Sequence, residues 1–422
     1  MRKIKIILLC ICFFVFIQLF CSSVLSSASE SKGLEFHTNN DGTCTLVGMG
    51  TCRDETVTIP SVSPDGELVI AIGEGAFRLE KNLRAIHFPE TLFRIEQGAF
   101  YGCSNLEEVT FSKYLVSIGA SAFADCKKLS EVNLSSELRR VEESAFKNCD
   151  SLLTVTLPDS IVYLGSGVFY SCDRLERVQL PASLTDLPDR FFSLCKSLKS
   201  LCLAPSVKSI GISAYSGCLG LQEISLGETI QTIGASAFAG CASVKALNLP
   251  KGLQTIGEMA FAGCVGLKEV TLPGVKEIPY GAFEGCSNVL TLALGEGTTS
   301  IASYAFAGCS ALQRVKLAGS VNAISVSAFR EDNHILVVEY AQGSKIPETV
   351  DNGMLFVRIQ QLAGDVSNDK RVDDNDVTLL QMAIEYPNLQ QHFNMDAMDI
   401  NADGKIDAVD LSLLLSLLDG SV

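Results

Sequence analysis

The stretch Leu221–Cys241, LQEISLGETIQTIGASAFAGC, decides the fold because close variants of it follow one another along most of the chain. Each variant holds one aromatic residue at an equivalent position, and these residues are spaced 23 apart at ten steps and 22 apart at one step. The twelve aromatics are Phe77, Phe100, Phe123, Phe146, Phe169, Phe192, Tyr215, Phe238, Phe261, Phe283, Phe306 and Phe329. A fixed period of about 20 to 50 residues indicates a solenoid, in which no coil buries its apolar face alone.

Each repeat predicts a strand, a turn and a return segment. Leu221–Leu226 places its apolar residues on one side of a strand, facing the core. The turn that follows often holds proline, at Pro89, Pro158, Pro181, Pro250 and Pro273. In the return segment, Ile233, Ala237 and Phe238 are expected in the core. Stacked strands lie about 4.8 Å apart, so twelve such coils would span about 58 Å.

Ten of the sixteen cysteines form a second column, three residues after the aromatics from Phe100 to Phe306. They are Cys103, Cys126, Cys149, Cys172, Cys195, Cys218, Cys241, Cys264, Cys286 and Cys309. By Cα distance alone, neighbouring coils would bring these sulfurs close enough for disulfides. Ten equivalent positions fit one packing rule better, and they favour a ladder of buried free thiols. No CxxC pair occurs, which removes the common zinc-ligand pattern.

The first 28 residues have the features of a secretory signal peptide. Arg2, Lys3 and Lys5 form a basic start. Ile6–Phe20 is almost entirely apolar, and small residues precede a predicted cleavage site after Ala28. A retained membrane anchor is the alternative interpretation. After signal cleavage, the mature chain is expected to have no contact with the membrane.

Residues 29–67 are predicted to cap the first coil, whose apolar face would otherwise be exposed. The alternation around Gly48 and Gly50, in DGTCTLVGMGTC, predicts a hairpin. Cys44 and Cys52 would face each other across this hairpin. They would form either a disulfide or two unpaired thiols, and the sequence leaves both possibilities open.

The middle outward position of each predicted strand is small or polar in most repeats. These residues are His87, Thr110, Asn133, Thr156, Gln179, Cys202, Ser225, Asn248, Thr271, Ala293, Lys316 and Glu339. The column lacks the aromatic row that stacks on sugar rings, so it is either a solvated surface or a footprint for a protein or peptide. Cys202 is expected to be exposed, and an exposed thiol on a secreted protein can pair with another molecule.

Two acidic residues on this face raise a catalytic alternative. Glu108 and Glu131 occupy the same outward column on neighbouring coils, where their carboxylates could approach the separation of about 5 to 5.5 Å found in retaining glycosidases. No insertion forms a pocket near them and no aromatic platform flanks them. The preferred interpretation is therefore that both are solvated carboxylates on an exposed strand. The four histidines are far apart in the sequence and accompany no GxSxG serine motif.

The net charge of −15 argues against nucleic acid as a partner, and most of it is concentrated near the C-terminus. Residues 365–422 hold eleven aspartates and one glutamate against two lysines and one arginine. A local acidic excess of this kind indicates a cation site rather than a general property of the surface.

Two acidic loops that begin 34 residues apart account for this excess. They are Asp365–Asp376, DVSNDKRVDDND, and Asp399–Asp410, DINADGKIDAVD. Calcium takes about six to eight oxygen ligands, and both loops have the spacing of an EF-hand loop, with aspartate in place of glutamate at the last position. An apolar stripe at helical spacing follows each loop, which predicts two helices that pack together.

The sequence therefore predicts two calcium ions, held through alternate positions of the two loops. The first set of ligands is Asp365, Ser367, Asp369, the carbonyl of Arg371, Asp373 and Asp376. The second set is Asp399, Asn401, Asp403, the carbonyl of Lys405, Asp407 and Asp410. The sixth position of the loop makes a sharp turn that usually needs glycine. It is Gly404 in the second loop but Lys370 in the first.

The repeat phrase AFxGCxxLxxVxLPxxLxxIG, over Leu68–Tyr340, resembles the BspA type of leucine-rich repeat found on bacterial surface proteins. The resemblance implies an α/β-type repeat solenoid with strand-rich coils at residues 68–340. It also implies a role in adhesion or protein binding and no enzyme chemistry. Residues 341–363 would form a C-terminal cap and linker.

The segment from Gly364 to Gly420, with its duplicated loop and helix, resembles a type I dockerin. The resemblance implies a small all-α calcium-binding domain at residues 364–422, which would bind a cohesin module of a scaffoldin in a cellulosome. The family's recognition positions follow each loop and lie about two turns into each helix. Here they are Asp374, Asn375, Gln381 and Met382 in one copy, and Ala408, Val409, Leu415 and Ser416 in the other.

Together these features predict a secreted, non-catalytic component of a cell-surface cellulosome that takes part in plant polysaccharide breakdown indirectly. Cohesin binding would attach it to the scaffoldin, and the solenoid would present a face to an unidentified protein or surface ligand. Two alternatives stay open. One is a carbohydrate-active hydrolase of the cellulosome, because dockerins usually carry enzymes. The other is a surface adhesin whose C-terminus is only a calcium-stabilised cap.

Overall fold

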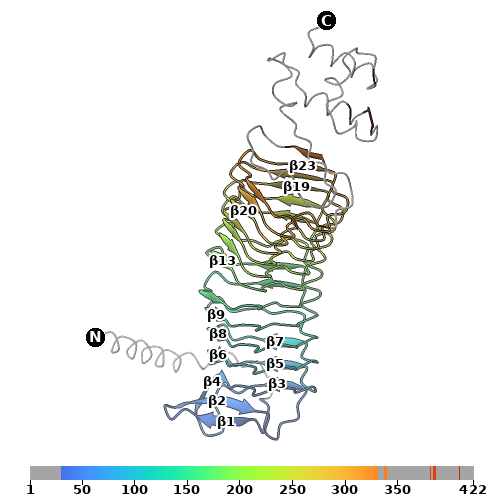
Figure 1. The fold of residues 1–422 in the computed structure, drawn as a ribbon. Coiled ribbons are helices and arrows are strands. Elements are labelled where there is room, and N and C mark those ends of the chain that lie inside the picture. The colour runs from blue at the N-terminus through green and yellow to red at the C-terminus, as the bar shows by residue number, and fades with distance from the viewer. Residues whose placement is uncertain (1–29, 331–336, 340–380, 382–383, 386–407, 409–422) are drawn as a thin grey trace, which may run out of the picture.

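The computed structural model describes residues 30–330, 337–339, 381, 384–385 and 408. Figure 1 shows an elongated stack of coils, which begins at β1 (Glu35–Thr38) and β2 (Thr43–Gly48) and continues beyond β23 (Arg314–Lys316). Each coil contributes up to two short strands, so the strands form two columns along the stack. The predicted strand-rich solenoid is confirmed. Within the described part of the chain, no helix is long and apolar enough to span a membrane.

The first column, here called the front column, contains the strand that each repeat predicts. Its members are β3 (Thr56–Thr58), β5 (Ala85–His87), β7 (Glu108–Thr110), β10 (Thr154–Thr156), β12 (Arg177–Gln179), β15 (Glu223–Ser225), β17 (Ala246–Asn248), β19 (Glu269–Leu272), β21 (Thr291–Leu294), β23 and β25 (Val337–Glu339). The segments Glu131–Leu134 and Ser200–Leu203 stand at the equivalent place in two coils and form no strand. The front column is therefore interrupted twice by irregular backbone, and strand pairing also stops between β17 and β19.

The return segment, where the repeat indicated only core residues, forms a second column of strands, here called the return column. Its members are β4 (Leu68–Ile72), β6 (Arg94–Ile95), β8 (Ser117–Ile118), β9 (Arg140–Val141), β11 (Tyr163–Leu164), β13 (Asp186–Leu187), β14 (Ser209–Ile210), β16 (Thr232–Ile233), β18 (Thr255–Ile256), β20 (Glu277–Ile278), β22 (Ser300–Ile301) and β24 (Ala323–Ile324). Most are only two residues long, which is why the alternation of a strand is not visible in the sequence.

Strands of neighbouring coils pair in parallel, each residue with its equivalent one repeat away. Ile224 pairs with Leu247 in the front column, and Ile210 pairs with Ile233 in the return column. This register stacks like residues on one another, so an apolar position in one coil continues as an apolar row through the core. The return column divides into three paired groups, which end at β11, β18 and β24.

The aromatic column forms a continuous stack at the centre of the core. All twelve rings are buried. Consecutive ring centroids lie from 4.9 Å apart, between Phe77 and Phe100, to 6.2 Å apart, between Phe169 and Phe192. Stacked aromatic pairs contribute about 0.5–1.5 kcal/mol beyond the area that they bury. The predicted core position of these residues is confirmed.

A ladder of backbone hydrogen bonds runs along this stack and is here called the aromatic corner. In the coil of Phe238, the N–H groups of Ser236, Phe238 and Gly240 donate to carbonyls of the next coil at 2.7–2.8 Å. The same three bonds recur at every step from the coil of Phe77 to the coil of Phe329. Ser236 and Gly240 have φ angles of 53° and 73°, the left-handed conformation, which turns the chain tightly around the ring.

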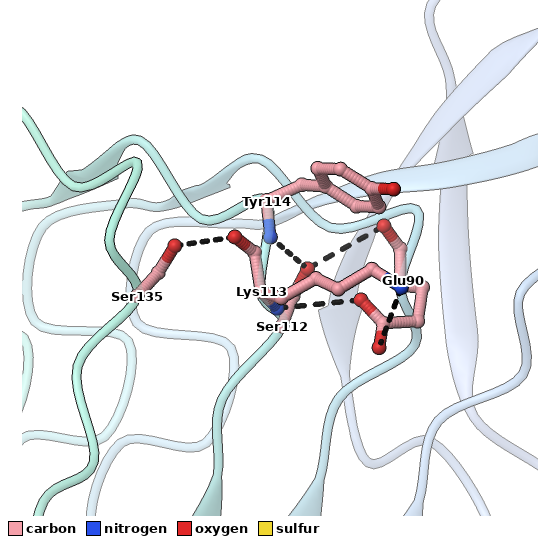
Figure 2. A network of polar contacts seen from close by, with 5 residues as sticks. All are labelled: Glu90, Ser112, Lys113, Tyr114 and Ser135. Atoms are coloured by element: carbon pink, nitrogen blue, oxygen red, sulfur yellow. Dashed lines mark hydrogen bonds and ion pairs between the residues drawn. The ribbon is translucent and has the colours of Figure 1, made fainter.

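Hydroxyl groups in the turns form additional hydrogen bonds between neighbouring coils. Figure 2 shows one such turn, where the Ser112 hydroxyl donates to the carbonyl of Glu90 at 3.4 Å. In the next coil, the Ser135 hydroxyl donates to the carbonyl of Lys113 at 2.5 Å. The Lys113 ammonium and the Glu90 carboxylate are 3.7 Å apart, but both side chains are more than half exposed. Such exposed ion pairs contribute little to stability, so the hydroxyl bonds matter more here.

The N-terminal hairpin forms, but its predicted position around Gly48 and Gly50 is wrong. β1 and β2 pair antiparallel through a turn at Asn39–Gly42. Asn40 has a φ of 62°, and asparagine tolerates this left-handed conformation better than most residues, so the Asn-rich segment makes the turn. β2 then pairs with β4, which places the hairpin over the exposed edge of the first coil.

The shifted hairpin also answers the question about its two cysteines. Cys44 lies in β2 opposite Thr38, whereas Cys52 follows the end of β2, so the two do not face each other. Both are buried free thiols. Of the two possibilities that the sequence leaves open, the structure has the unpaired thiols.

Candidate functional site

The outward residues of the front column form the candidate binding surface, and the strands place them as the repeat predicts. His87 is in register with Thr110, and Ser225 is in register with Asn248. Most of the column is exposed, although His87 and Ala293 are half-buried. The His87 Nδ1 lies 3.0 Å from the Thr110 hydroxyl, so these side chains also bond along the column. A row of small polar groups can contact another polypeptide closely, but it offers no enclosed pocket.

Cys202 is half-buried, so its predicted exposure is wrong. It lies in the irregular segment Ser200–Leu203 with a φ of 53°, which turns its side chain away from the outward direction of a strand. Its sulfur accepts a hydrogen bond from the Val178 N–H at 3.4 Å. The thiol therefore takes the place of a backbone acceptor that a regular strand would provide.

Glu108 and Glu131 are both exposed, but the structure does not pair them across two strands. Glu108 begins β7, whereas Glu131 lies in the irregular segment Glu131–Leu134. The Glu131 carboxylate accepts a hydrogen bond from the side chain of Asn133 at 2.9 Å. The regular register on which the glycosidase alternative depended is absent, and the arrangement fits two solvated carboxylates.

Two shallow hollows lie on the surface of the described coils. One, of about 530 Å³, borders the irregular segment Glu131–Leu134 and is also lined by Thr154 and Thr156. The other, of about 580 Å³, lies against the aromatic corner, where the guanidinium of Arg78 stands 4.6 Å from the centre of the Tyr101 ring. This cation–π contact occupies a ring face that a ligand would otherwise use.

The cysteine column is a ladder of free, buried thiols, as predicted. Each sulfur donates to the carbonyl of the aromatic residue in the preceding coil; the distance is 2.9 Å from Cys103 to Phe77 and 3.2 Å from Cys241 to Tyr215. Burial raises the pKa of the Cys103 thiol to about 12. Because the thiolate is the reactive form, these cysteines stabilise the core and are chemically inert in the folded state.

Metal chemistry has no support among the described residues. No group of three or more histidine, cysteine, aspartate or glutamate side chains in that part of the chain is arranged to hold a metal ion. His37 is exposed on β1 and His87 bonds to Thr110, while His334 and His392 lie outside the described residues.

Most of the predicted C-terminal site residues lie outside the described residues, including all the calcium ligands of both loops. The described exceptions are Gln381 and Ala408, each of which is helical and exposed. These two residues belong to the predicted cohesin-contacting positions. The helices and loops around them are therefore predictions of the sequence, and so are the signal peptide and the C-terminal cap.

Two left-handed positions that flank each aromatic residue were not predicted from the repeat. They fall two residues before and two residues after the ring, and every coil from Phe77 to Phe306 has both. The signal was present, since glycine, serine, asparagine or aspartate occupies most of these positions. Five residues adopt the same conformation without such a signal, because the hydrogen bonds of the aromatic corner impose it: Leu79, Arg190, Leu194, Met259 and Tyr304.

The comparisons with known proteins agree with this geometry. The chain matches the model of the BspA type leucine-rich repeat region at residues 70–199, 117–245 and 231–349. It matches the model of the type I dockerin domain at residues 363–419. No curated protein sequence matches the chain.

The chain is also similar to solved structures of leucine-rich repeat proteins. A leucine-rich cell surface protein from Faecalibacterium prausnitzii A2-165 is 27% identical with a TM-score of 0.54, over 77% of this chain and 97% of that chain. A leucine-rich repeat protein from Bacteroides ovatus ATCC 8483 is 23% identical with a TM-score of 0.37, over 75% of this chain and 100% of the other. The repeat model covers well over half of the residues, and so the chain belongs to the BspA-type leucine-rich repeat family and carries a type I dockerin domain after its repeats.

Proposed function

We propose that the protein is a non-catalytic binding component, which a calcium-dependent contact between its dockerin and a cohesin holds on a scaffold protein. One observation carries the proposal: a type I dockerin match at residues 363–419 follows an array of repeats that is itself a binding module. Both families are non-catalytic modules. The protein would therefore assist polysaccharide breakdown by attachment and recognition rather than by cleavage.

The solenoid is the part that would recognise a ligand. Its front column presents exposed small polar residues over many coils, such as Thr110, Thr156 and Ser225. An extended, shallow face of this kind suits a protein or a large surface, since small molecules prefer enclosed pockets. A structural relative in Faecalibacterium prausnitzii is a cell surface protein, which supports an extracellular or cell-surface location for this chain.

Type I dockerin domains bind calcium, and we assign two ions to the loops Asp365–Asp376 and Asp399–Asp410. Both loops supply carboxylate and amide or hydroxyl oxygens, the hard ligands that calcium prefers. Lys370 replaces glycine at the sharp turn of the first loop. A left-handed conformation costs a residue with a side chain about 1–2 kcal/mol, so the first loop should bind calcium about tenfold more weakly or slightly more.

The two copies of the dockerin present different chemistry to a cohesin. Ala408 and Val409 are small and apolar, whereas Asp374 and Asn375 are polar. The centre of a protein interface favours apolar contact and excludes unpaired charge. We therefore assign the second copy to the centre of the contact, and the exposure of Ala408 supports this assignment.

Titration of the full chain against type I cohesins, with calcium present, tests this function. Ala408→Asp with Val409→Asp should abolish binding, because the buried carboxylates would have no partner. Asp374→Ala with Asn375→Ala is the matched control and should change the affinity by less than about tenfold. If the control pair is the more damaging, the assigned orientation is wrong. If no cohesin binds, or if binding persists in chelator, the scaffold function is wrong.

A second experiment tests the solenoid. The full chain is incubated with cell-wall fractions and secreted proteins, and the bound ligand is compared between two variants. Thr110→Arg with Thr156→Arg alters the front column and should abolish capture, whereas Gln231→Arg with Gln254→Arg alters exposed residues of the return segments and should not. If the full chain hydrolyses plant polysaccharides, and if Glu108→Gln or Glu131→Gln removes that activity, the catalytic alternative is supported instead.

A further inference from the structure

The return column is held together by the residue that follows each of its strands. The N–H of Gly165 donates to the carbonyl of Val141 in the preceding coil at 2.8 Å, and the N–H of Gly211 donates to Leu187 at 2.9 Å. The same bond recurs in every described coil except two. In those two coils the residue is Pro188 or Pro279, and proline has no N–H to donate.

The two prolines coincide with the two places where the return column stops pairing. β11 does not pair with β13, which Pro188 follows, and β18 does not pair with β20, which Pro279 follows. The interruption between β11 and β13 is here called the Pro188 seam. Proline in a strand removes one ladder bond, and a ladder of only two residues has few others to hold it.

Other backbone groups at the Pro188 seam also lose their partners. In the next coil, the N–H groups of Lys208 and Ser209 both donate to the carbonyl of Thr185, at 2.7 and 3.4 Å. Among the described residues, the equivalent N–H groups of Thr185 and Asp186 have no backbone acceptor in the coil before them. Val162, which stands at the equivalent outward position of the coil before them, is 74% exposed.

A bulky side chain holds the two coils apart at the same place. Phe191 occupies the position just before the core aromatic, where most coils have alanine. Its ring packs edge-on against Phe169, 5.5 Å away, and against Phe192, 4.8 Å away. The separation of Phe169 and Phe192, 6.2 Å, is the largest between consecutive rings of the described stack.

The front column is weakened in the same coil. Its segment Ser200–Leu203 forms no strand, and the Val178 N–H turns to the sulfur of Cys202. The aromatic corner, in contrast, crosses the seam intact. The N–H groups of Gly167, Phe169 and Ser171 donate to the Phe192 coil at 2.8–3.1 Å.

Away from the corner, fewer backbone bonds cross the seam. The Lys199 N–H donates to the Glu176 carbonyl at 3.4 Å, and the Ala182 N–H donates to the Asp159 carboxylate at 2.8 Å. The ion pairs Lys196–Asp173 and Lys199–Glu176 also cross it, but they are substantially exposed and contribute little. The two coils are thus fully bonded only along the aromatic corner.

We propose that the Pro188 seam is a hinge. The coils before and after it move as two blocks about the aromatic corner, because the corner keeps all of its bonds while both strand columns are interrupted. Opening and closing the seam would change the curvature of the front column while the bonds of the aromatic corner stay formed. The solenoid could then fit its front face to ligands of different shape, whatever their chemistry.

Distances between spin labels in the full chain test the hinge. The pair Arg139→Cys and Thr185→Cys spans the seam, and the pair Lys208→Cys and Gln254→Cys spans the same number of coils without a seam. All four positions are exposed, and Cys202→Ser removes the half-buried native thiol. The distance distribution across the seam should be about twice as broad as that of the control pair. Equal widths would overturn the proposal.

Restoring the missing donor should close the hinge. Pro188→Ala supplies an N–H, and the Cβ is tolerated because Glu142 and Ala302 occupy equivalent positions and still donate, both at 2.9 Å. The variant should narrow the distribution to that of the control pair and slow hydrogen exchange at Thr185 and Asp186 by about tenfold or more. Pro250→Ala, in a turn, should change neither. An unchanged width in the Pro188→Ala chain would overturn the hinge.

Creating a seam elsewhere gives an independent result if Pro188→Ala does not fold. The N–H of Glu142 donates to Ile118 in a regular part of the return column. Glu142→Pro should therefore increase hydrogen exchange about tenfold at Arg139 and Arg140, whose N–H groups now donate to Val116. Unchanged protection at these two amides would show that proline at this position does not open the column, and the proposal would fail.

Discussion

The hydroxyl of Tyr215 donates a 2.5 Å hydrogen bond to the carbonyl of Leu201, across the interior of the coil. Tyr215 is the one tyrosine in the aromatic column, and its side chain is fully buried. A buried hydroxyl needs a partner, and the irregular segment Ser200–Leu203 leaves this carbonyl free. The one tyrosine of the aromatic column therefore lies opposite the irregular segment of the front column. The irregular segment leaves a carbonyl without a strand partner, and the tyrosine hydroxyl bonds to that carbonyl.

Tyr215→Phe should destabilise the protein by about 1–3 kcal/mol, because it leaves the Leu201 carbonyl buried without a donor. Urea unfolding, followed by circular dichroism, measures the change. Tyr304→Phe is the control: its hydroxyl accepts from Arg330 at 2.8 Å near the surface, and its loss should change stability by less than about 0.5 kcal/mol. Equal effects of the two substitutions would contradict the assigned role of the Leu201 bond.

Thiol accessibility should separate Cys202 from the other cysteines. Of the thirteen cysteines in the described part of the chain, Cys202 alone is not buried. The folded mature chain should therefore react with a thiol reagent such as DTNB at one site quickly, and at the remaining sites only on unfolding. Cys202→Ser should remove the fast phase. A second fast thiol in that variant would show that the ladder opens in the native state.

Alkaline pH should unfold the solenoid through its thiol ladder. Burial raises the pKa of nine ladder thiols from the ordinary value of 9.0, for example to about 12 at Cys195 and Cys286. The unfolded chain loses these protons above pH 9 while the folded chain keeps them, so stability is full below pH 9 and falls as the pH rises towards 12. At pH 10 each thiol should contribute about 1.4 kcal/mol of this loss.

Urea unfolding under reducing conditions at pH 8 and pH 10 measures this loss. Cys126→Ala with Cys149→Ala is the control, since removal of two ladder thiols should reduce the difference between the two pH values. An equal difference in the variant and the parent chain would assign the alkaline transition to other groups.

Phe238→Ala should cost about 3–5 kcal/mol, the range for removing a buried aromatic ring. Phe238 stacks on Tyr215 at 5.2 Å and on Phe261 at 5.5 Å, so both neighbours lose a contact face. Coils interact only with their neighbours, so faster hydrogen exchange should be confined to about residues 200–280. A uniform loss of protection along the whole array would show that the coils fold as one unit.

Chelation of calcium should affect the dockerin and spare the solenoid. The aspartates of residues 365–422 repel one another without a cation, and metal binding adds folding free energy. Calorimetry of the full chain should show two transitions with calcium, of which the one from the dockerin disappears in chelator. A single transition that is identical in both conditions would contradict the predicted calcium loops.

The repeat predicted the coils well because its apolar positions can be buried in only one arrangement of the chain. Phe238 and its eleven equivalents can be buried only if the coils stack in register, and this fixes the core, the front strands and the thiol ladder together. The outward column follows from the same register. These features depend on periodicity, which the sequence displays twelve times.

The features that escaped prediction are those that depend on a single residue. Cys202 was expected outside because its neighbours in the column are outside, but a left-handed backbone turns it partly inward. The hairpin was placed at Gly48 although Asn39–Gly42 makes the turn, since several small polar residues competed for that role. An interpretation based on the residue that most repeats share at a position hides such exceptions. Pro188 was overlooked for the same reason, because most repeats have another residue there.

The aromatic corner has a consequence for the evolution of the chain. Every step along it uses the same three backbone bonds, and each step up to Phe306 adds one thiol bond. A coil that is duplicated or deleted within that part of the array therefore leaves its new neighbours with the contacts they had before. The step of 22 residues, between Phe261 and Phe283, keeps these bonds although its turn has lost a residue. The length of the solenoid can therefore drift by unequal recombination, and the reach of its binding face can change without any redesign of the core.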